Sequence, residues 1–117
     1  MQPLNEESLD GATLEEIHAA LFLQLVAGHA QTALVLLGQA ENPHTGTVEA
    51  IQLEGAKIFL DHLEMLEVKT RGNLGALEAD ALRQALDVVR TAFARELDAQ
   101  LRDPSAEERQ PPAGGVR

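Results

Sequence analysis

The chain has 117 residues and a mass of 12.6 kDa, which is one small domain whose folding buries about two-thirds of the surface exposed by the unfolded chain. Ala and Leu dominate its 44% hydrophobic content and aromatic residues reach only 3%, so a β-sandwich or barrel, which draws on β-branched and aromatic residues, is disfavoured. The net charge of -10 opposes binding to nucleic acids and anionic lipids, and the absence of cysteine excludes disulfides, thiolate metal sites and thiol catalysis.

The N-terminal residues 1–12 carry no helical pattern, and we expect them to form a flexible acidic segment. They lack the basic start and apolar stretch of a secretory signal, so we expect a cytoplasmic protein. The segment from Ile17 to Leu37 is about as long as a bilayer crossing. It contains five polar side chains that would each need a partner in hydrocarbon, and its flanks are acidic rather than basic. We therefore expect no membrane insertion.

A helix over residues 14–37 is the first predicted element. Thr13 and Glu16 have the spacing of a capping box, in which the hydroxyl accepts from the backbone N–H of Glu16 and the carboxylate reaches back. Only Gly28, which a helix tolerates, interrupts the pattern that follows. Gly38 offers the left-handed backbone that commonly ends a helix.

Two further helices are predicted after a loop. Turn signals between Gln39 and Thr47 indicate a loop of about nine residues. A helix that begins between Thr47 and Leu53 follows and covers about residues 50–71. Gly72 and Asn73 readily take left-handed backbone angles and would end that helix, and a third helix covers residues 76–101. The predicted organisation is a flexible N-terminus (1–12), a single helical domain (13–102) and a disordered tail rich in Pro, Gly and charge (103–117).

The first predicted helix differs from the others because it is apolar on two separate sides. The later helices each have one main apolar face and one charged face, as expected for members of a bundle. One face of the first helix holds Leu14, Ile17, Leu21, Leu25 and Val35. The other holds Ala19, Phe22, Leu23, Val26, Ala30, Ala33, Leu34 and Leu37.

A three-helix bundle hides only one face of each member, so the remaining face needs another surface. Fully burying a leucine is worth about 1.5 to 3 kcal/mol, which makes an uncovered apolar face costly. A second copy of the same chain is the simplest cover. Gly28 and Thr32 would let two helix backbones approach closely there. We therefore predict an all-α, three-helix hairpin-type bundle that assembles as a homo-oligomer, with an interface of Ile17, Leu21, Leu25, Gly28, Thr32 and Val35.

Several short motifs carry a family resemblance. They are Asn42-Pro43-x-Thr45-Gly46, Asp61-x-Leu63-x-Met65-Leu66 and Lys69-Thr70-x-Gly72-Asn73-Leu74, continued by Leu82, Leu86, Arg90 and Phe93. With these motifs the chain resembles the bacterial family called domain of unknown function 1844 over about residues 17 to 95. The resemblance implies a small, helical, bacterial, intracellular protein. It implies nothing about catalysis, a ligand or a substrate.

Histidines are the candidates for a metal site, because neutral imidazole is a good metal ligand. His18 and His29 share a side of the first helix but lie about 16 Å apart along it, so they cannot hold one ion within that helix. They could meet copies of themselves, or His62 of the second helix. The alternative is that these histidines form hydrogen bonds to a neighbouring helix, which we favour because no His-x-x-x-His spacing occurs.

A second candidate site is the basic and hydrogen-bonding cluster of Lys69, Thr70, Gly72 and Asn73. It could hold an anion or an acidic peptide. Its position at a predicted helix end favours a capping role, in which positive side chains and a left-handed residue satisfy the last carbonyls. Arg90 could either reach a carboxylate of the second helix or pair with Asp87 on its own helix.

No phosphate-binding loop, nucleophile elbow or pair of carboxylates in a common cleft is evident. We therefore expect a non-enzymatic helical protein without a cofactor, which self-associates through its first helix as a homodimer or higher homo-oligomer and serves as an interaction or scaffold module. We expect no nucleic-acid partner and no membrane partner, and the sequence names no protein partner. The alternative is a small-ligand or metal-binding helical module that uses the histidines at a helix interface.

Overall fold

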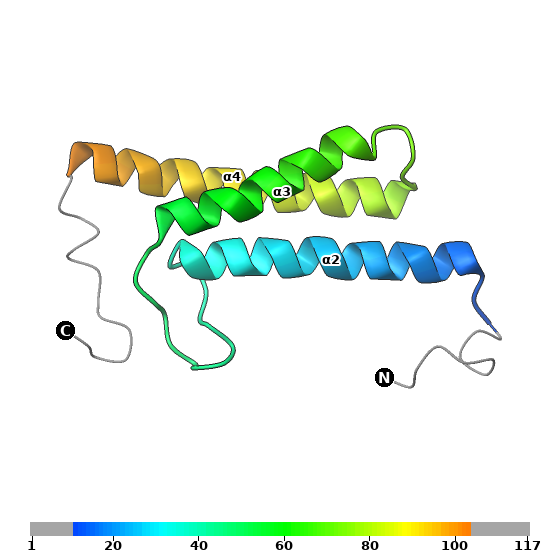
Figure 1. Cartoon of the computed structure of the whole chain (residues 1–117), viewed down its shortest axis with the longest axis horizontal. Helices are drawn as coiled ribbons and strands as arrows, with labels where there is room; N and C mark the ends of the chain where they lie inside the picture. Colours follow the sequence, from blue (N-terminus) through cyan, green and yellow to red (C-terminus); the bar gives the residue numbers. More distant parts are fainter. Residues whose placement is uncertain (1–10, 104–117) are drawn as a thin grey trace.

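The computed structural model describes residues 11–103, which fold into three α-helices, α2 (Leu14–Leu36), α3 (Leu53–Lys69) and α4 (Ala76–Arg102). No strand occurs in this range, so the prediction of an all-α fold is confirmed. Figure 1 shows α3 running back along α2, and α4 running in the direction of α2 again. The predicted flexible N-terminus and disordered tail lie outside the described residues, except for their inner ends.

The start and end of α2 follow from local sequence, as predicted. The backbone N–H of Glu16 donates to Thr13 Oγ1 at 3.0 Å, and the Thr13 N–H donates to Glu16 Oε1 at 3.0 Å. At the other end the N–H of Leu37 donates to the carbonyl of Ala33, and Gly38 takes a φ of 71°. Both ends of the helix therefore have partners for otherwise free backbone groups.

The second predicted helix begins at Leu53, at the late end of the range in which its start was expected. Ile51 is buried, and the N–H of Gln52 donates to the carbonyl of Leu36 at 2.8 Å. These contacts hold the chain against the end of α2 in a non-helical conformation. The connection is consequently longer than the nine or so residues that the turn signals suggested.

The turn between α3 and α4 follows the predicted capping pattern. Thr70 Oγ1 donates to the carbonyl of Leu66 at 2.6 Å, and Gly72 takes a φ of 80°. Gly72 alone supplies the left-handed conformation, since no other residue type in the described range has a positive φ. At the start of α4 the N–H of Gly75 donates to Glu78 Oε1 at 2.6 Å.

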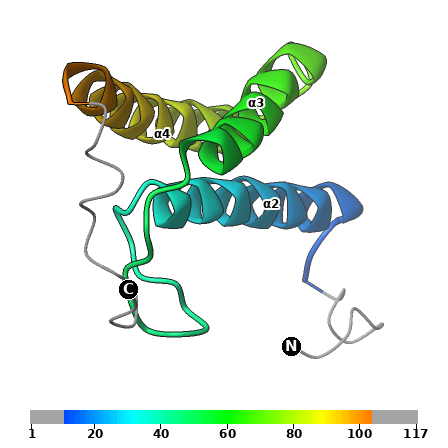
Figure 2. The same cartoon turned by 60° about the vertical axis from the view of Figure 1, so that its left-hand side comes forward.

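The core lies where the three helices meet. Figure 2 shows α3 and α4 together on one side of α2. The residues of α2 that contact them belong to the face containing Val26, Ala33 and Leu37, which are 2%, 0% and 0% exposed. The main buried cluster contains Val26, Ala33, Leu60, Leu63, Leu82, Leu86 and Val89. One of the two apolar faces of α2 is thus covered from within the chain.

Candidate functional site

The other apolar face of α2 is largely open to solvent. Leu14, Leu21 and Leu25 are 67%, 51% and 45% exposed, and Gly28 is exposed as well. We use the name outer face for a stripe of residues along this side of α2. It is formed by Leu14, His18, Leu21, Leu25, Gly28 and Thr32. Its members are separated alternately by four and three residues, the spacing at which one helix packs lengthwise against another.

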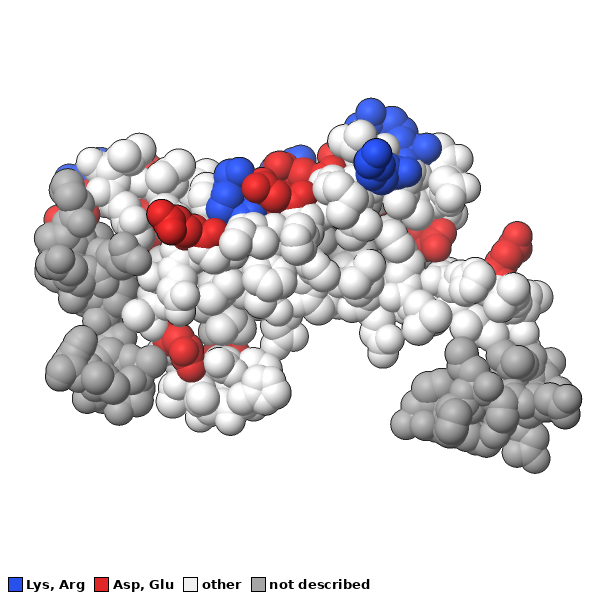
Figure 3. Space-filling view, viewed as in Figure 1, with Lys and Arg blue, Asp and Glu red and all other residues white. Residues whose placement is uncertain are grey.

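The outer face belongs to a helix that is almost without charge. No Asp, Glu, Lys or Arg occurs between residues 17 and 40, although the chain carries a net charge of -10. In Figure 3 the surface over α2 is mostly white, and the charged atoms gather over α3 and near the ends of the molecule. A surface that met the outer face would therefore encounter almost no formal charge there.

By length and composition, α2 is also suited to crossing a membrane. The apolar core helix of a soluble protein meets the same criterion, and one face of α2 is packed in the core. His18, Gln24 and Gln31 interrupt its exposed side. The expectation of no membrane insertion stays a prediction.

A hollow of about 320 Å³ lies beside the outer face at its C-terminal end. An added Cβ at Gly28 would find no atom within 4 Å, so the surface over this residue is open. The lining consists of Gly28, Gln31, Thr32 and Val35 of α2 together with Asn42, Pro43 and His44 of the following loop. The hollow is therefore a recess between a helix and a loop.

The loop wall of this hollow is held by its own hydrogen bonds. Asn42 Nδ2 and Thr45 Oγ1 both donate to Glu49 Oε2, at 3.2 and 3.1 Å. The His44 N–H donates to Asn42 Oδ1 at 2.8 Å, and Gly46 takes a φ of 73°. These bonds give the loop a defined conformation beside α2.

The predicted interface needs one correction at this end. Val35 is only 8% exposed, so the chain's own fold already covers it. Residues of the loop line the same hollow as Val35, so the loop lies beside this end of α2. Of the other predicted interface residues, Leu21, Leu25 and Gly28 are exposed, and Ile17 and Thr32 are half-buried. The accessible part of the face therefore runs from Leu14 to Thr32.

A short apolar stripe of α3 adjoins the outer face. Ile58 and Met65 are 54% and 46% exposed, and His62 lies between them on the same side of the helix. His29 Nε2 of α2 is 3.2 Å from His62 Nδ1, so this side of α3 is next to α2. The exposed apolar surface thus extends from α2 onto α3.

His29 and His62 are two of the three candidate metal ligands, and in this contact they form a hydrogen bond with each other. The second ring nitrogen of His29, Nδ1, lies 3.2 Å from the carbonyl oxygen of Leu25. Both imidazoles pack against the ring of Phe59, with centroids 5.4 and 5.8 Å away. His18 instead lines a separate recess near the turn between α3 and α4. Within residues 11–103 no group of three potential ligands is close enough to hold a metal ion.

Of the cluster of Lys69, Thr70, Gly72 and Asn73, the last three form the turn that ends α3, and Lys69 is exposed in the last turn of the helix. The Asn73 N–H donates to the carbonyl of Thr70 at 2.9 Å, in addition to the hydroxyl bond of Thr70 itself. These hydrogen bonds satisfy the end of α3. The arrangement fits the capping interpretation, and nothing in it points to a bound anion.

The charged residues of α3 and α4 form ion pairs within each helix and between the two helices. Arg90 reaches two carboxylates of α3, with its Nε 3.1 Å from Glu64 Oε2 and its Nη2 3.5 Å from Glu67 Oε1. The hydrogen bond from Lys57 Nζ to Asp61 raises the pKa of the lysine. Such exposed pairs add little stability, about 0 to 1 kcal/mol each. The outer face of α2, by contrast, contains no Asp, Glu, Lys or Arg.

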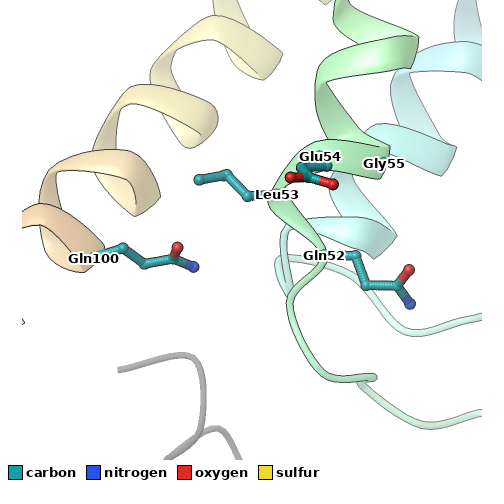
Figure 4. A pocket seen from close by; sticks show the side chains of 5 residues that line it. All are labelled: Gln52, Leu53, Glu54, Gly55 and Gln100. Atoms are coloured by element: carbon teal, nitrogen blue, oxygen red, sulfur yellow. The ribbon is translucent and has the colours of Figure 1, made fainter. Parts of the chain in front are cut away.

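A recess of about 550 Å³ between the start of α3 and the end of α4 provides no catalytic arrangement. It is lined by Gln52, Leu53, Glu54, Gly55 and Gln100, and Figure 4 shows these side chains spread around an open space. Glu54 is the sole ionisable group of the lining. Acid–base catalysis with carboxylates needs a second group in a different environment.

Comparisons with known proteins agree with the resemblance noted in the motifs. A family model matches residues 19–95, which include most of α2, all of α3 and most of α4. The comparisons with curated proteins and with solved structures gave no match. The matched region is well over half of the chain, so the chain belongs to the family described as Domain of unknown function (DUF1844).

Proposed function

We propose that this protein is a non-enzymatic helical interaction module that self-associates as a homodimer through the outer face of α2. The observation that carries the proposal is the exposure of Leu14, Leu21 and Leu25 on an uncharged helix whose opposite face is already packed in the core. Exposed apolar patches of this kind mark interaction sites in soluble proteins. A second copy presents the same uncharged surface and needs no separate partner.

The exposed leucines set the expected affinity. Their exposed fractions of 67%, 51% and 45% together amount to somewhat more than one and a half leucine side chains per copy. At about 1.5 to 3 kcal/mol for a fully buried leucine, two copies gain about 5 to 10 kcal/mol. Association costs about 4 to 15 kcal/mol in lost freedom, which is of the same order. The three leucines alone therefore leave little net free energy, so we expect a weak dimer, with a dissociation constant of about tens of micromolar or more, to which Ile58 and Met65 of α3 add contact at its edge.

Multi-angle light scattering over a range of micromolar concentrations tests the proposal, together with binding of a dye that reports exposed apolar surface. The expected result is a mass that rises toward two chains, with dye binding that falls as the mass rises. A mass of one chain throughout, with no dye binding, refutes self-association. Lipid vesicles provide the control for membrane binding, and co-sedimentation with vesicles in place of dimer formation would favour a membrane partner.

The metal-binding alternative has less support. His29 and His62 are hydrogen-bonded to each other, and His18 lies apart from them. Elemental analysis of the purified protein separates the two hypotheses. A stoichiometric metal would favour the metal-binding module, whereas a protein without metal would favour self-association.

A further inference from the structure

We propose that the two copies meet antiparallel, on a two-fold axis at Leu21, so that Leu14 of each copy enters the hollow at Gly28 of the other. This inference rests on the proposed self-association and adds the direction and register of the two helices. It also gives the recess between α2 and its loop an occupant, the most exposed leucine of the outer face.

The spacing of the outer face fits this arrangement. Leu14 and Gly28 each lie seven residues from Leu21, or about 10.5 Å along the helix axis on either side. A two-fold axis that passes through Leu21 perpendicular to α2 therefore places Leu14 of one copy opposite Gly28 of the other. Leu14, the most exposed leucine of the outer face, then lies opposite Gly28, the one residue of that face without a side chain.

The loop after α2 argues against the parallel alternative. In Figures 1 and 2 this loop extends from the end of α2 on the side away from α3 and α4. Asn42, Pro43 and His44 of the loop line the hollow together with Gly28 and Thr32 of the outer face. A parallel pair would place both loops at the same end, where they would hold the helices apart. An antiparallel pair places them at opposite ends, where each loop lies beside the N-terminal half of the other α2.

Charge and shape favour the same choice. A parallel pair brings Glu15 and Glu16 of both copies to one end, where four carboxylates repel one another. It also sets Leu14 against Leu14 and leaves both hollows empty. The antiparallel pair separates the acidic ends and opposes the dipoles of the two helices.

Single cysteines test the direction directly, because the chain has none of its own. The variants are Leu14→Cys, Leu21→Cys and Gly28→Cys, joined by a short bismaleimide, with Leu77→Cys on α4 as the measure of random collisions. The antiparallel register predicts that Leu21→Cys links to itself, and that Leu14→Cys links to Gly28→Cys in a mixture. It also predicts that Leu14→Cys alone stays at the level of the Leu77→Cys control.

Each contrary result has a definite meaning. Efficient linking of Leu14→Cys to itself overturns the antiparallel register, while the proposed self-association stands. A dimeric wild type in which Leu21→Cys links no better than the control also overturns the register alone. A wild type that is monomeric at every concentration removes the proposed function together with this inference.

Filling the hollow provides a second test that does not depend on cross-linking. Gly28→Leu occupies the recess that Leu14 would enter, and we expect it to weaken self-association at least tenfold. Ala20→Leu is the matched control, because it adds the same side chain to an exposed position of α2 outside the outer face. Equal affinity in the two variants would overturn the inference. Circular dichroism verifies that both remain helical.

Discussion

Leu21→Glu is the substitution that probes the outer face most sharply. Leu21 is 51% exposed, so burying the rest of it contributes about 0.75 to 1.5 kcal/mol per copy. In the proposed dimer the two copies of Leu21 face each other, which doubles that contribution. The substitution also places two carboxylates close together in a partly desolvated contact, where each costs additional free energy. We expect the dissociation constant to rise at least about 100-fold, since about 1.4 kcal/mol corresponds to tenfold.

The same substitution should leave the folded monomer unchanged. Glu is nearly as good a helix former as Leu, and the side chain at position 21 points into solvent in a single copy. We expect the free energy of unfolding of the monomer to change by less than about 0.5 kcal/mol. Urea unfolding at low protein concentration measures this quantity.

Sedimentation velocity over a dilution series measures the dissociation constant. Leu77→Glu is the matched control, because Leu77 is a leucine on α4 that is 74% exposed and lies outside the proposed interface. We expect the control to associate like the wild type. An unchanged dissociation constant for Leu21→Glu, or an equal loss in both variants, would refute the reasoning.

Three further predictions concern the fold and the histidine pair. Leu63→Ala should lower the free energy of unfolding by about 2 to 5 kcal/mol, because Leu63 is completely buried among all three helices; a loss below about 1 kcal/mol in urea unfolding would contradict its place in the core. Thr13→Ala should cost about 1 kcal/mol in the same assay, since it removes the hydroxyl that accepts from the Glu16 N–H, whereas Thr13→Ser should retain most of the wild-type stability. Added zinc should leave Tm unchanged, because His29 and His62 bond to each other without a third ligand in the described part of the chain; a rise in Tm that His62→Ala abolishes would establish a metal site.

Local sequence signals were sufficient for the helix ends that depend on neighbouring residues. The capping box at Thr13, the left-handed Gly38 and the glycine turn at Gly72 all involve partners within a few positions along the chain. The two apolar faces of the first helix also follow from its periodicity. One of them packs in the core and the other is exposed, as the limited size of a three-helix bundle implies.

Features that depend on distant contacts were not predictable in the same way. Only a range could be predicted for the start of α3, because its position at Leu53 depends on Ile51 and Gln52 packing against the end of α2, and no local signal specifies that contact. The periodicity of α2 places Val35 on the outer face but carries no information about the tertiary packing that leaves it only 8% exposed. The contact of His29 with His62 was one of the possibilities left open, because it depends on how α2 and α3 are rotated relative to each other, which neither helix determines alone.

Thiol labelling of Leu25→Cys tests most directly whether the outer face becomes buried between two copies. Leu25 is 45% exposed in the single chain, so its cysteine should react readily at low protein concentration. The account predicts that the labelling rate falls several-fold as concentration rises through the micromolar range, while Leu77→Cys on α4 reacts at a constant rate. A labelling rate at position 25 that is independent of concentration would contradict the account.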